Sequence, residues 1–562
     1  MTPFQAVHWA VTPGAGQGDA VASMPDGGAL RLAFLSGSMA RVTWVRPDGF
    51  REPATWAIAP TAGEDVPWQG RLRDSLAGFS RPSLTVRNSS ATDSNSAPSL
   101  ETTDLRVTLA AGVAGTPRLI WQAPTTGQVY LGDRATSAYL ASKRTGAIRH
   151  CVVRDPADRY FGLGDKTGPL NLHGRRLRCM GQDSLGYDPQ SGDPLYKHWP
   201  FLMQRTPDGL WLGIFYDTLS ACTFDLGCEH DNYHDFFRTI EIDDGDLDYY
   251  IMVGDSPAAV LHQFMALIGG THLPPKWSVG FALTAMGLAD APDAQQQLTA
   301  FIAACGDNRM PISAFHYGSG YSSRGKQRYV FNWNRDKFPD PEGINRSFQE
   351  AGMRLVANIK PCLLDDHPAY QTVRDADGFI NNRSTGEPVV EPFWDGNGAY
   401  LDFTKPQAVQ WWQSGLRQQI LEKGIDSGWN DNNEYAIQSE DAVSDLWGQV
   451  GPIHRSRPLH ALLMTRATFE AQTAYATATG RDEAVYTITR AGPPGLQRYA
   501  QTWSGDNTTS WETLKWNIRT GLQMSLSGMF NVGHDVGGFF GPSPEPELLA
   551  RWVQACALNP RM

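Results

Sequence analysis

Short runs in which hydrophobic and polar positions alternate fill the chain up to about residue 265. Examples lie at residues 30–45, 105–112, 117–123, 210–218 and 247–254. Alternation of this kind indicates strands with one buried face. Clusters of Gly, Pro, Asn and Ser separate the runs, and the stretch RNSSATDSNSAPS at 87–99 predicts a polar loop. We therefore predict an N-terminal all-β sandwich over residues 1–265.

The pattern changes near residue 266, at the segment THLPPKWSVG. From there, strand-like runs occur at 277–283, 312–318, 354–361, 424–431, 484–491, 499–506 and 528–535. Runs with helical apolar spacing lie between several of them, at 290–305, 341–352, 407–424 and 510–526. This alternation predicts a parallel sheet, and seven strands favour a (β/α)8 barrel of the TIM type over residues 266–562. The predicted fold class is α/β multidomain.

The last residues, LLARWVQACALNPRM, indicate a seventh barrel helix leading into a strand that barely starts. A barrel with seven strands is not closed, so we expect the barrel to be incomplete at its C-terminus. We expect the eighth strand and any C-terminal β-domains to be missing through truncation of the chain.

Composition narrows the classes of partner. A net charge of -11 argues against a nucleic acid or an anionic membrane as partner. The seven cysteines have no CxxC pair, which is typical of free thiols in a reducing compartment. With no basic, apolar leader at the N-terminus and no membrane-length apolar run, we expect a cytoplasmic protein. The sequence leaves open whether the chain forms a homo-oligomer.

Charged and aromatic residues gather where the predicted barrel strands end, which is where barrel enzymes place their reacting groups. Asp431, Arg490, Asp506 and Asp535 follow the fourth to seventh strands, and three aromatic residues lie beside them: Trp429, Trp503 and Phe539. Paired carboxylates and flat rings are typical of glycoside chemistry, in which one group protonates the leaving oxygen and another attacks the sugar carbon. We expect no cofactor and no metal, since only His534 stands near as a further ligand.

Each of these residues also has a structural interpretation. Asp431 could cap a helix after its strand, and Asp506 could belong to a turn. Arg490 could pair with a structural carboxylate. Glu434 lies in the loop beyond the strand end, so we expect it to be a hydrogen-bond partner rather than the nucleophile. Trp394 could line a distal subsite or pack on the surface.

Four motifs resemble glycoside hydrolase family 31, the α-glucosidase and α-xylosidase family. GWNDNNEY is similar to its W-x-D-M-N-E signature, and TRAGPPGLQRYAQTWSGDN to its R-(S/A)-G…W-x-G-D-N block. GHDVGGF resembles its G-x-D-I-G-G-F, and the stretch from Tyr160 to Phe201 resembles the loop that its N-terminal sandwich sends over the active site. The likeness runs in order from about residue 160 to the end of the chain.

The resemblance implies a retaining mechanism, with Asp431 as nucleophile and Asp506 as general acid/base. It implies that Arg490 binds a sugar hydroxyl, and that Asp535 orients groups within the pocket. The aromatic residues would form the wall of the sugar subsite: Trp429, Trp503 and Phe539. We expect Asp193, on the sandwich loop, to contact a hydroxyl from above.

The chain departs from the family pattern in three places. FHYGSGYSS stands where many relatives carry an acid after the second strand, so Ser319 or Tyr321 must serve there. Asn432 and Tyr435 replace the Met and Pro of the commoner signature. The histidine that the family places on the eighth strand lies beyond Met562. The departures leave the sugar preference open.

The resemblance favours an α-glucosidase that releases terminal glucose from small oligosaccharides. An α-galactosidase, an α-xylosidase or a transglucosylase would use the same two acids. A non-catalytic carbohydrate-binding relative is a different class, but it would not need both Asp431 and Asp506. A phosphosugar-binding barrel would use the Gly-rich segment GHDVGGFFG, whose Asp disfavours a phosphate.

Overall fold

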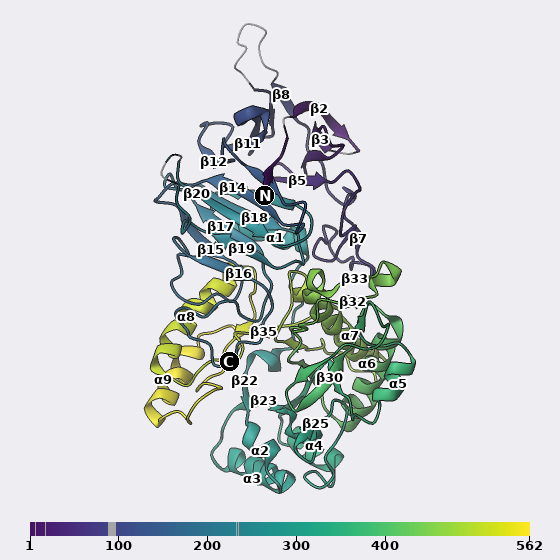
Figure 1. Cartoon of the computed structure of the whole chain (residues 1–562). Helices are drawn as coiled ribbons and strands as arrows, with labels where there is room; N and C mark the ends of the chain where they lie inside the picture. Colours follow the sequence, from purple (N-terminus) through teal and green to yellow (C-terminus); the bar gives the residue numbers. More distant parts are fainter. Residues whose placement is uncertain (6, 17, 88–96, 232, 234) are drawn as a thin grey trace. The chain divides into compact units, whose positions relative to one another are not determined.

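Two units make up the protein in the computed structural model, which describes residues 1–5, 7–16, 18–87, 97–231, 233 and 235–562 (Figure 1). The sandwich unit contains residues 1–180, 190–270 and 522–529. The barrel unit contains residues 181–189, 271–521 and 530–562. Each unit thus includes a short segment that is distant in sequence from the rest of it. Of the polar loop predicted at 87–99, residues 88–96 lie outside the described residues.

The sandwich unit is built on an eight-stranded antiparallel sheet. In spatial order its strands are β15 (Arg159–Gly162), β17 (Phe201–Arg205), β18 (Trp211–Tyr216), β21 (Asp248–Gly254), β5 (Met39–Val45), β4 (Ala29–Phe34), β3 (Gly18–Ser23) and β2 (His8–Ala15). Helix α1 (Pro257–Ile268) packs on β18 and β21, and the Ser256 side chain caps its first turn. The predicted strand runs at 30–45, 210–218 and 247–254 all lie in this sheet.

Two further sheets complete the sandwich unit. One has the order β1 (Thr2–Pro3), β13 (Tyr139–Ala141), β14 (Ile148–Val153), β20 (Phe237–Ile242), β19 (Cys222–Asp225) and β16 (Arg176–Cys179). The other has the order β12 (Val129–Gly132), β11 (Pro117–Gln122), β10 (Arg106–Ala111), β9 (Ser99–Glu101) and β8 (Thr85–Arg87). Side chains from all three sheets share one buried apolar core, including Leu32, Val107 and Ile240. The predicted β-sandwich is therefore confirmed.

The barrel unit contains seven parallel strands in the order of the sequence. A five-stranded sheet holds β22 (Phe281–Thr284), β23 (Ile312–Tyr317), β26 (Arg354–Ile359), β31 (Ser427–Asn430) and β34 (Ile488–Thr489). A parallel pair follows, β35 (Thr502–Trp503) and β36 (Val532–Gly533), and a bridge between Ile488 and Gln501 links it to β34. The carbonyl of Met562 accepts a hydrogen bond from the Ala282 amide in β22, at 3.1 Å. Among the described residues the barrel is incomplete, as predicted.

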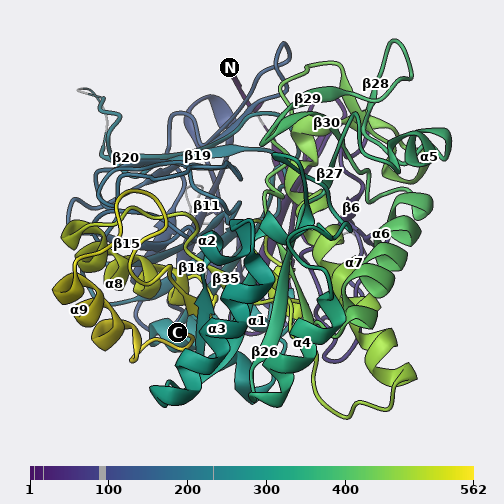
Figure 2. The same cartoon turned by 90° about the horizontal axis from the view of Figure 1, so that it is seen from below.

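Helices separate most of these strands. They are α2 (Met286–Asp290), α3 (Ala294–Asp307), α4 (Pro341–Glu350), α6 (Pro406–Gln419), α7 (Arg457–Ala478), α8 (Trp511–Ser525) and α9 (Pro546–Cys556). Helices α3 and α4 pack against each other, and so do α6 and α7, along the outside of the sheet (Figure 2). None of the described helices is long and apolar enough to cross a membrane.

A long insertion follows β26 and carries small sheets of its own. It contains β27 (Cys362–Leu364), α5 (Tyr370–Asp375), β28 (Asn381–Asn382), β29 (Val390–Phe393) and β30 (Gly396–Tyr400). Strands β29 and β30 form a hairpin with Trp394 at its tip. The insertion therefore places an aromatic side chain beyond the carboxyl end of the barrel strands.

Helix α7 is anchored to the sheet by polar side chains. Gln472 accepts a hydrogen bond from the Gly428 amide at 2.7 Å, and it donates to the Tyr486 carbonyl at 2.8 Å and to Thr487 Oγ1 at 2.7 Å. Thr465 and Thr468 bind Asn430 in β31. Helix α7 thus holds β31, the strand that Asp431 follows. A shift of the helix along the strand would break these hydrogen bonds.

We expect Gln472→Leu to destabilise the protein, because the apolar side chain removes three buried hydrogen bonds, although the Tyr486 carbonyl keeps the one from Ser427 Oγ. Each buried polar group left without a partner costs about 1–3 kcal/mol. Chemical unfolding should therefore show a loss of at least about 2 kcal/mol. The matched control is Gln371→Leu on α5, where the glutamine is exposed and bonds only Asp375. Equal stabilities of the two variants would contradict this account.

Candidate active site

The ends of the parallel strands bring the candidate residues to one edge of the barrel sheet. The Asp431 amide donates to the Ile359 carbonyl at 3.0 Å, and the Arg490 amide donates to the Asn430 carbonyl at 3.0 Å. The hydrogen bonds between the parallel strands thus continue one residue past β31 and β34. The Ser504 amide bonds the Gly533 carbonyl at 3.2 Å, just before Asp506. The backbone register therefore places Asp431, Arg490 and Asp506 on neighbouring strand ends.

The asparagines around Asp431 hold its loop in place. Asn430 binds Thr468, and Asn433 bonds the Thr489 hydroxyl and the Ala491 amide, each at 3.0 Å. Asn432 has a φ of 47°, in the left-handed region that asparagine tolerates better than most residues. Asn432 therefore turns the chain sharply after Asp431, while Asn430 and Asn433 bind the adjacent helix and strand.

Arg490 is the centre of the charge arrangement and is only 1% exposed. Its Nε and Nη2 bind both oxygens of Glu434, at 2.7 and 2.8 Å. Its Nη1 donates to Asp506 Oδ2 at 2.9 Å, and its Nη2 lies 3.0 Å from Asp183 Oδ2. Asp431 Oδ1 lies 3.4 Å from Nε. One guanidinium thus holds four carboxyl groups from separate segments of the chain.

Asp431 is ionised at neutral pH. Burial by itself would raise the pKa of this carboxyl, but the charges of Lys360 and Arg490 and the hydrogen bonds from Asn358 and Lys360 hold the pKa well below its usual range. Asn358 Nδ2 and Lys360 Nζ reach Asp431 Oδ2 at 2.9 and 2.7 Å. These contacts therefore favour the ionised form of the Asp431 carboxylate.

Asp506 differs from Asp431 although both bind Arg490. Burial raises the pKa of Asp506 to about 7, with Arg490 opposing the shift and the negative charges of Asp431, Asp183 and Glu434 adding to it. A carboxyl with this pKa exists in both protonation states near neutral pH. The two acids therefore have pKa values moved in opposite directions, which is the pattern of a nucleophile paired with an acid/base.

Aromatic side chains form part of the pocket wall. Trp429 and Trp503 are buried and meet edge to face, with ring centroids 5.7 Å apart. Trp429 lines the pocket with Phe539, which is 37% exposed, while Trp503 supports Trp429 from behind. About 510 Å³ of space lies between the lining residues, part of it open to solvent.

Several predicted residues line this one pocket: Trp429, Asp431, Arg490, Asp506 and Phe539. Of the two candidates after the second strand, Ser319 lines the pocket, whereas the Tyr321 hydroxyl is buried and donates to the Asn358 carbonyl at 2.9 Å. Asp535 does not line it, but burial and the nearby Asp506 raise the pKa of Asp535 well above its usual value.

The sugar contact expected of Asp193 stays a prediction. Asp193 belongs to the sandwich unit, where its carboxylate accepts from Lys166 Nζ at 2.6 Å and from the Arg178 amide at 2.5 Å. Asp183, which belongs to the barrel unit, binds Arg490 and accepts from Asn432 Nδ2 at 3.0 Å. Sequence reasoning missed this acid.

Sequence reasoning also missed several pocket residues: Met286, Arg328, Asn358 and Lys360. A signal for Lys360 was present, because it directly follows the third strand, at the position that Asp431 occupies after the fourth. Arg328 is held by Asp290 and Asp395, at 3.2 Å from each. Among the described residues, no group of three or more His, Cys, Asp or Glu side chains has the arrangement of a metal site.

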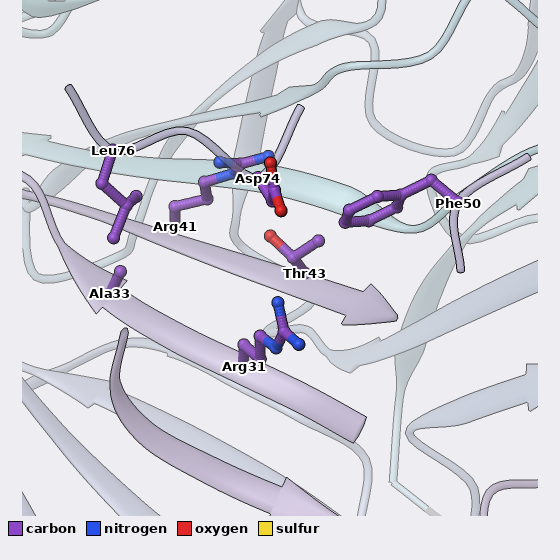
Figure 3. A pocket seen from close by; sticks show the side chains of 7 residues that line it. All are labelled: Arg31, Ala33, Arg41, Thr43, Phe50, Asp74 and Leu76. Carbon is purple, nitrogen blue, oxygen red and sulfur yellow. The ribbon is translucent and has the colours of Figure 1, made fainter. Parts of the chain in front are cut away.

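A second hollow, of about 300 Å³, lies within the sandwich unit. Figure 3 shows Arg31, Thr43 and Asp74 pointing toward a common space beside Phe50. The Arg41 guanidinium there binds Asp248 at 2.7 Å, and the lining has a single carboxylate. It lacks the paired acids of the barrel pocket.

The family assignment follows from comparison with known proteins. A model of the glycosyl hydrolase family 31 TIM-barrel domain matches residues 271–562, and a model of the family 31 N-terminal galactose mutarotase-like domain matches residues 29–225. The chain belongs to glycosyl hydrolase family 31.

Individual relatives agree with this assignment. Alpha-glucosidase 2 of Bacillus thermoamyloliquefaciens is 29% identical over 421 residues, which are 73% of this chain and 50% of the relative. Alpha-xylosidase XylQ of Lactiplantibacillus pentosus is 26% identical over 466 residues, which are 81% of this chain and 57% of the relative. This family 31 chain therefore spans about half the length of the curated relatives it matches.

A solved structure shares the fold across the whole chain. The family 31 dextranase of Flavobacterium johnsoniae, complexed with glucose, superimposes with a TM-score of 0.83 at 22% identity. The match covers 100% of this chain and 64% of the dextranase. At this identity the likeness establishes the fold alone.

We expect Arg490→Met to destabilise the protein by about 3 kcal/mol or more near neutral pH, because it leaves buried carboxylates without their cation. The folded-state pKa of Asp431 lies below its unfolded value, so this group stabilises the fold above the unfolded pKa and loses that effect as pH falls. Without Arg490, the folded-state pKa values of the clustered acids rise, which penalises folding at neutral pH.

The deficit of Arg490→Met should therefore shrink when unfolding is measured at about pH 4, where the acids take up protons. Arg551→Met, on the exposed surface of α9, is the control and should behave like the parent. A deficit of the same size at both pH values would show that lost packing, and not charge, causes the effect.

Proposed function

We propose that this chain carries the active site of a retaining α-glycosidase, and that its preferred activity is that of an α-glucosidase releasing terminal α-linked glucose from small oligosaccharides. The observation that supports this most is the pair of acids on Arg490: Asp431 is held ionised while the pKa of Asp506 is raised to about 7. A retaining glycosidase needs these two protonation states together, with the carboxyl groups about 5–5.5 Å apart. Binding of both acids to one guanidinium is compatible with such a spacing.

The proposed reaction has two steps. In the first, an Asp431 oxygen bonds to the anomeric carbon while the bond from that carbon to the leaving oxygen breaks, and Asp506 gives its proton to the leaving oxygen. In the second, a water oxygen attacks the same carbon, its proton passes to Asp506, and the ester bond to Asp431 breaks. The products are the free sugar and the shortened alcohol or saccharide, and both acids return to their starting states.

The pocket wall suits a sugar followed by a second unit. Trp429 and Phe539 would face the sugar that is released, and Ser319 offers a hydroxyl. Trp394, at the tip of the β29–β30 hairpin and 50% exposed, would contact the leaving unit. An α-xylosidase activity is the second candidate, because two of the relatives are named α-xylosidase. The α-galactosidase and transglucosylase activities would use the same chemistry.

We expect release of nitrophenol from the aryl α-glucoside in a panel that also contains the α-xyloside and the α-galactoside. Asp431→Ala should lower this activity by at least about a thousandfold, because the variant lacks the carboxylate that forms the ester. Asp426→Ala is the control, since Asp426 precedes β31 at the end opposite to Asp431, where it binds Arg354 and does not line the pocket. A fully active Asp431→Ala variant would contradict the proposal, and a different preferred sugar would reassign the substrate.

The value of kcat/KM should fall as pH rises through about 7, because Asp506 then loses the proton that it must donate. Below that, kcat/KM should stay level well into the acid range, because Asp431 remains ionised. Asp506→Ala should remove the alkaline fall. It should also slow a disaccharide far more than a dinitrophenyl glycoside, whose leaving group needs no proton. Equal losses on both substrates would contradict the role of Asp506.

A further inference from the structure

The two oxygens of Asp431 have different surroundings. Oδ2 accepts hydrogen bonds from Asn358 Nδ2 at 2.9 Å and from Lys360 Nζ at 2.7 Å. Oδ1 is buried and, within the part of the chain that the structure describes, has no hydrogen-bond partner. Its nearest cation is Arg490 Nε, at 3.4 Å. The two donors therefore hold the carboxylate through Oδ2.

The backbone register fixes the donors on Oδ2. Strands β26 and β31 pair in parallel, with Ile359 opposite Asn430, so Lys360 follows directly beside Asp431. Asn358 and Lys360 are two residues apart on an extended chain and therefore project to the same side. The Tyr321 hydroxyl binds the Asn358 carbonyl and helps to hold this strand end.

Contacts with Asp431, Asn432 and Trp394 hold Lys360 in this position. Its side chain is 13% exposed, and its ammonium also donates to Asn432 Oδ1. The ring centroid of Trp394 lies 5.9 Å from Nζ, close enough for a cation–π attraction. The lysine thus joins the nucleophile, the turn that follows it and the aromatic tip of the inserted hairpin.

We propose that Lys360 and Asn358 are positioning residues that hold Asp431 through Oδ2, and that the Lys360 ammonium assists the departure of Asp431 in the second step. This inference rests on the proposed function, since it concerns the nucleophile of the same reaction.

The charge of Asp431 explains why the two steps respond differently to Lys360. When the bond between Asp431 and the sugar forms, Asp431 loses its negative charge, so the ammonium stabilises the free enzyme more than the first transition state. When that bond breaks in the second step, the charge returns and the ammonium stabilises it. Only interactions that strengthen toward a transition state accelerate that step. Lys360 therefore speeds the second step.

Other charged groups also act on Asp431 and remain when Lys360 is changed. They come from the loop of Asp431 itself and from the ends of β34, β35 and β36: Glu434, Arg490, Asp506 and Asp535. The difference between the parent and a Lys360 variant therefore isolates the lysine. Loss of a neighbouring cation raises the pKa of an Asp by about 1–3 units.

Kinetics of Lys360→Met with a dinitrophenyl glycoside test this role. We expect kcat to fall by about tenfold or more, with KM falling in parallel, so that kcat/KM near neutral pH changes little. A burst of dinitrophenol should precede the steady state, because the ester accumulates. The acidic limb of the kcat/KM profile should move up by about one pH unit or more. Lys360→Arg should restore the acidic limb toward that of the parent.

Two further variants complete the design. Lys405→Met is the matched control, because Lys405 is a buried lysine of the barrel unit that binds Asp377 instead, at 2.8 Å; its pH profile should equal that of the parent. Asn358→Ala removes the uncharged hydrogen-bond donor to Asp431 Oδ2. The acidic limb of its kcat/KM profile should move up by less than that of Lys360→Met. This variant provides the same test if Lys360→Met does not fold. An unmoved acidic limb, with kcat and kcat/KM lowered equally, would overturn the inference.

Trapping separates failure of this inference from failure of the proposed function. A fluorinated glycosyl fluoride, which forms a slowly hydrolysed ester, should label the peptide that contains Asp431 in the parent. A labelled Asp431 together with parental kinetics in Lys360→Met would overturn the role of Lys360 and leave the proposed function standing. A parent labelled on another residue would overturn both.

Discussion

The buried guanidinium of Arg490 is the interaction on which the pocket depends. It binds Asp183, Asp431, Glu434 and Asp506, which come from three separate stretches of the chain. Four carboxyl groups could not lie this close in a buried site without a cation, because their mutual repulsion and desolvation would protonate or disperse them. Glu434 takes two of the guanidinium's hydrogen bonds, which fixes the plane of the group and thereby the positions of the others.

A second cation gives the two candidate acids different properties. Lys360 and Arg490 both lie against Asp431, whereas Arg490 is the cation that binds Asp506. The same cluster of charges therefore lowers the pKa of one carboxyl and leaves burial to raise the pKa of the other. The distinction between the two acids is electrostatic, and it arises from which strand end carries a lysine.

Hydrogen bonds from behind the sheet keep these strand ends in register. Helix α7 contributes Thr465, Thr468 and Gln472, whose polar atoms bind the backbone and Asn430 of β31 and the segment leading into β34. A polar inner face on a buried helix obscures the apolar periodicity by which helices are recognised, which is why the sequence pattern did not indicate α7. The cost of burying Thr465, Thr468 and Gln472 is met because each of these three side chains has a hydrogen-bond partner.

The sequence by itself determined the order of the strands, the sandwich and barrel classes, and the residues that directly follow β31, β34 and β35. These features are local: alternation indicates a strand, and in a parallel sheet the next residue must lie at the shared edge. The tertiary structure decided that Asp183 and Glu434 bind Arg490, and that Lys360 binds one oxygen of Asp431. These are pairings between side chains up to several hundred positions apart, and they depend on which partner each buried charge finds when the chain packs.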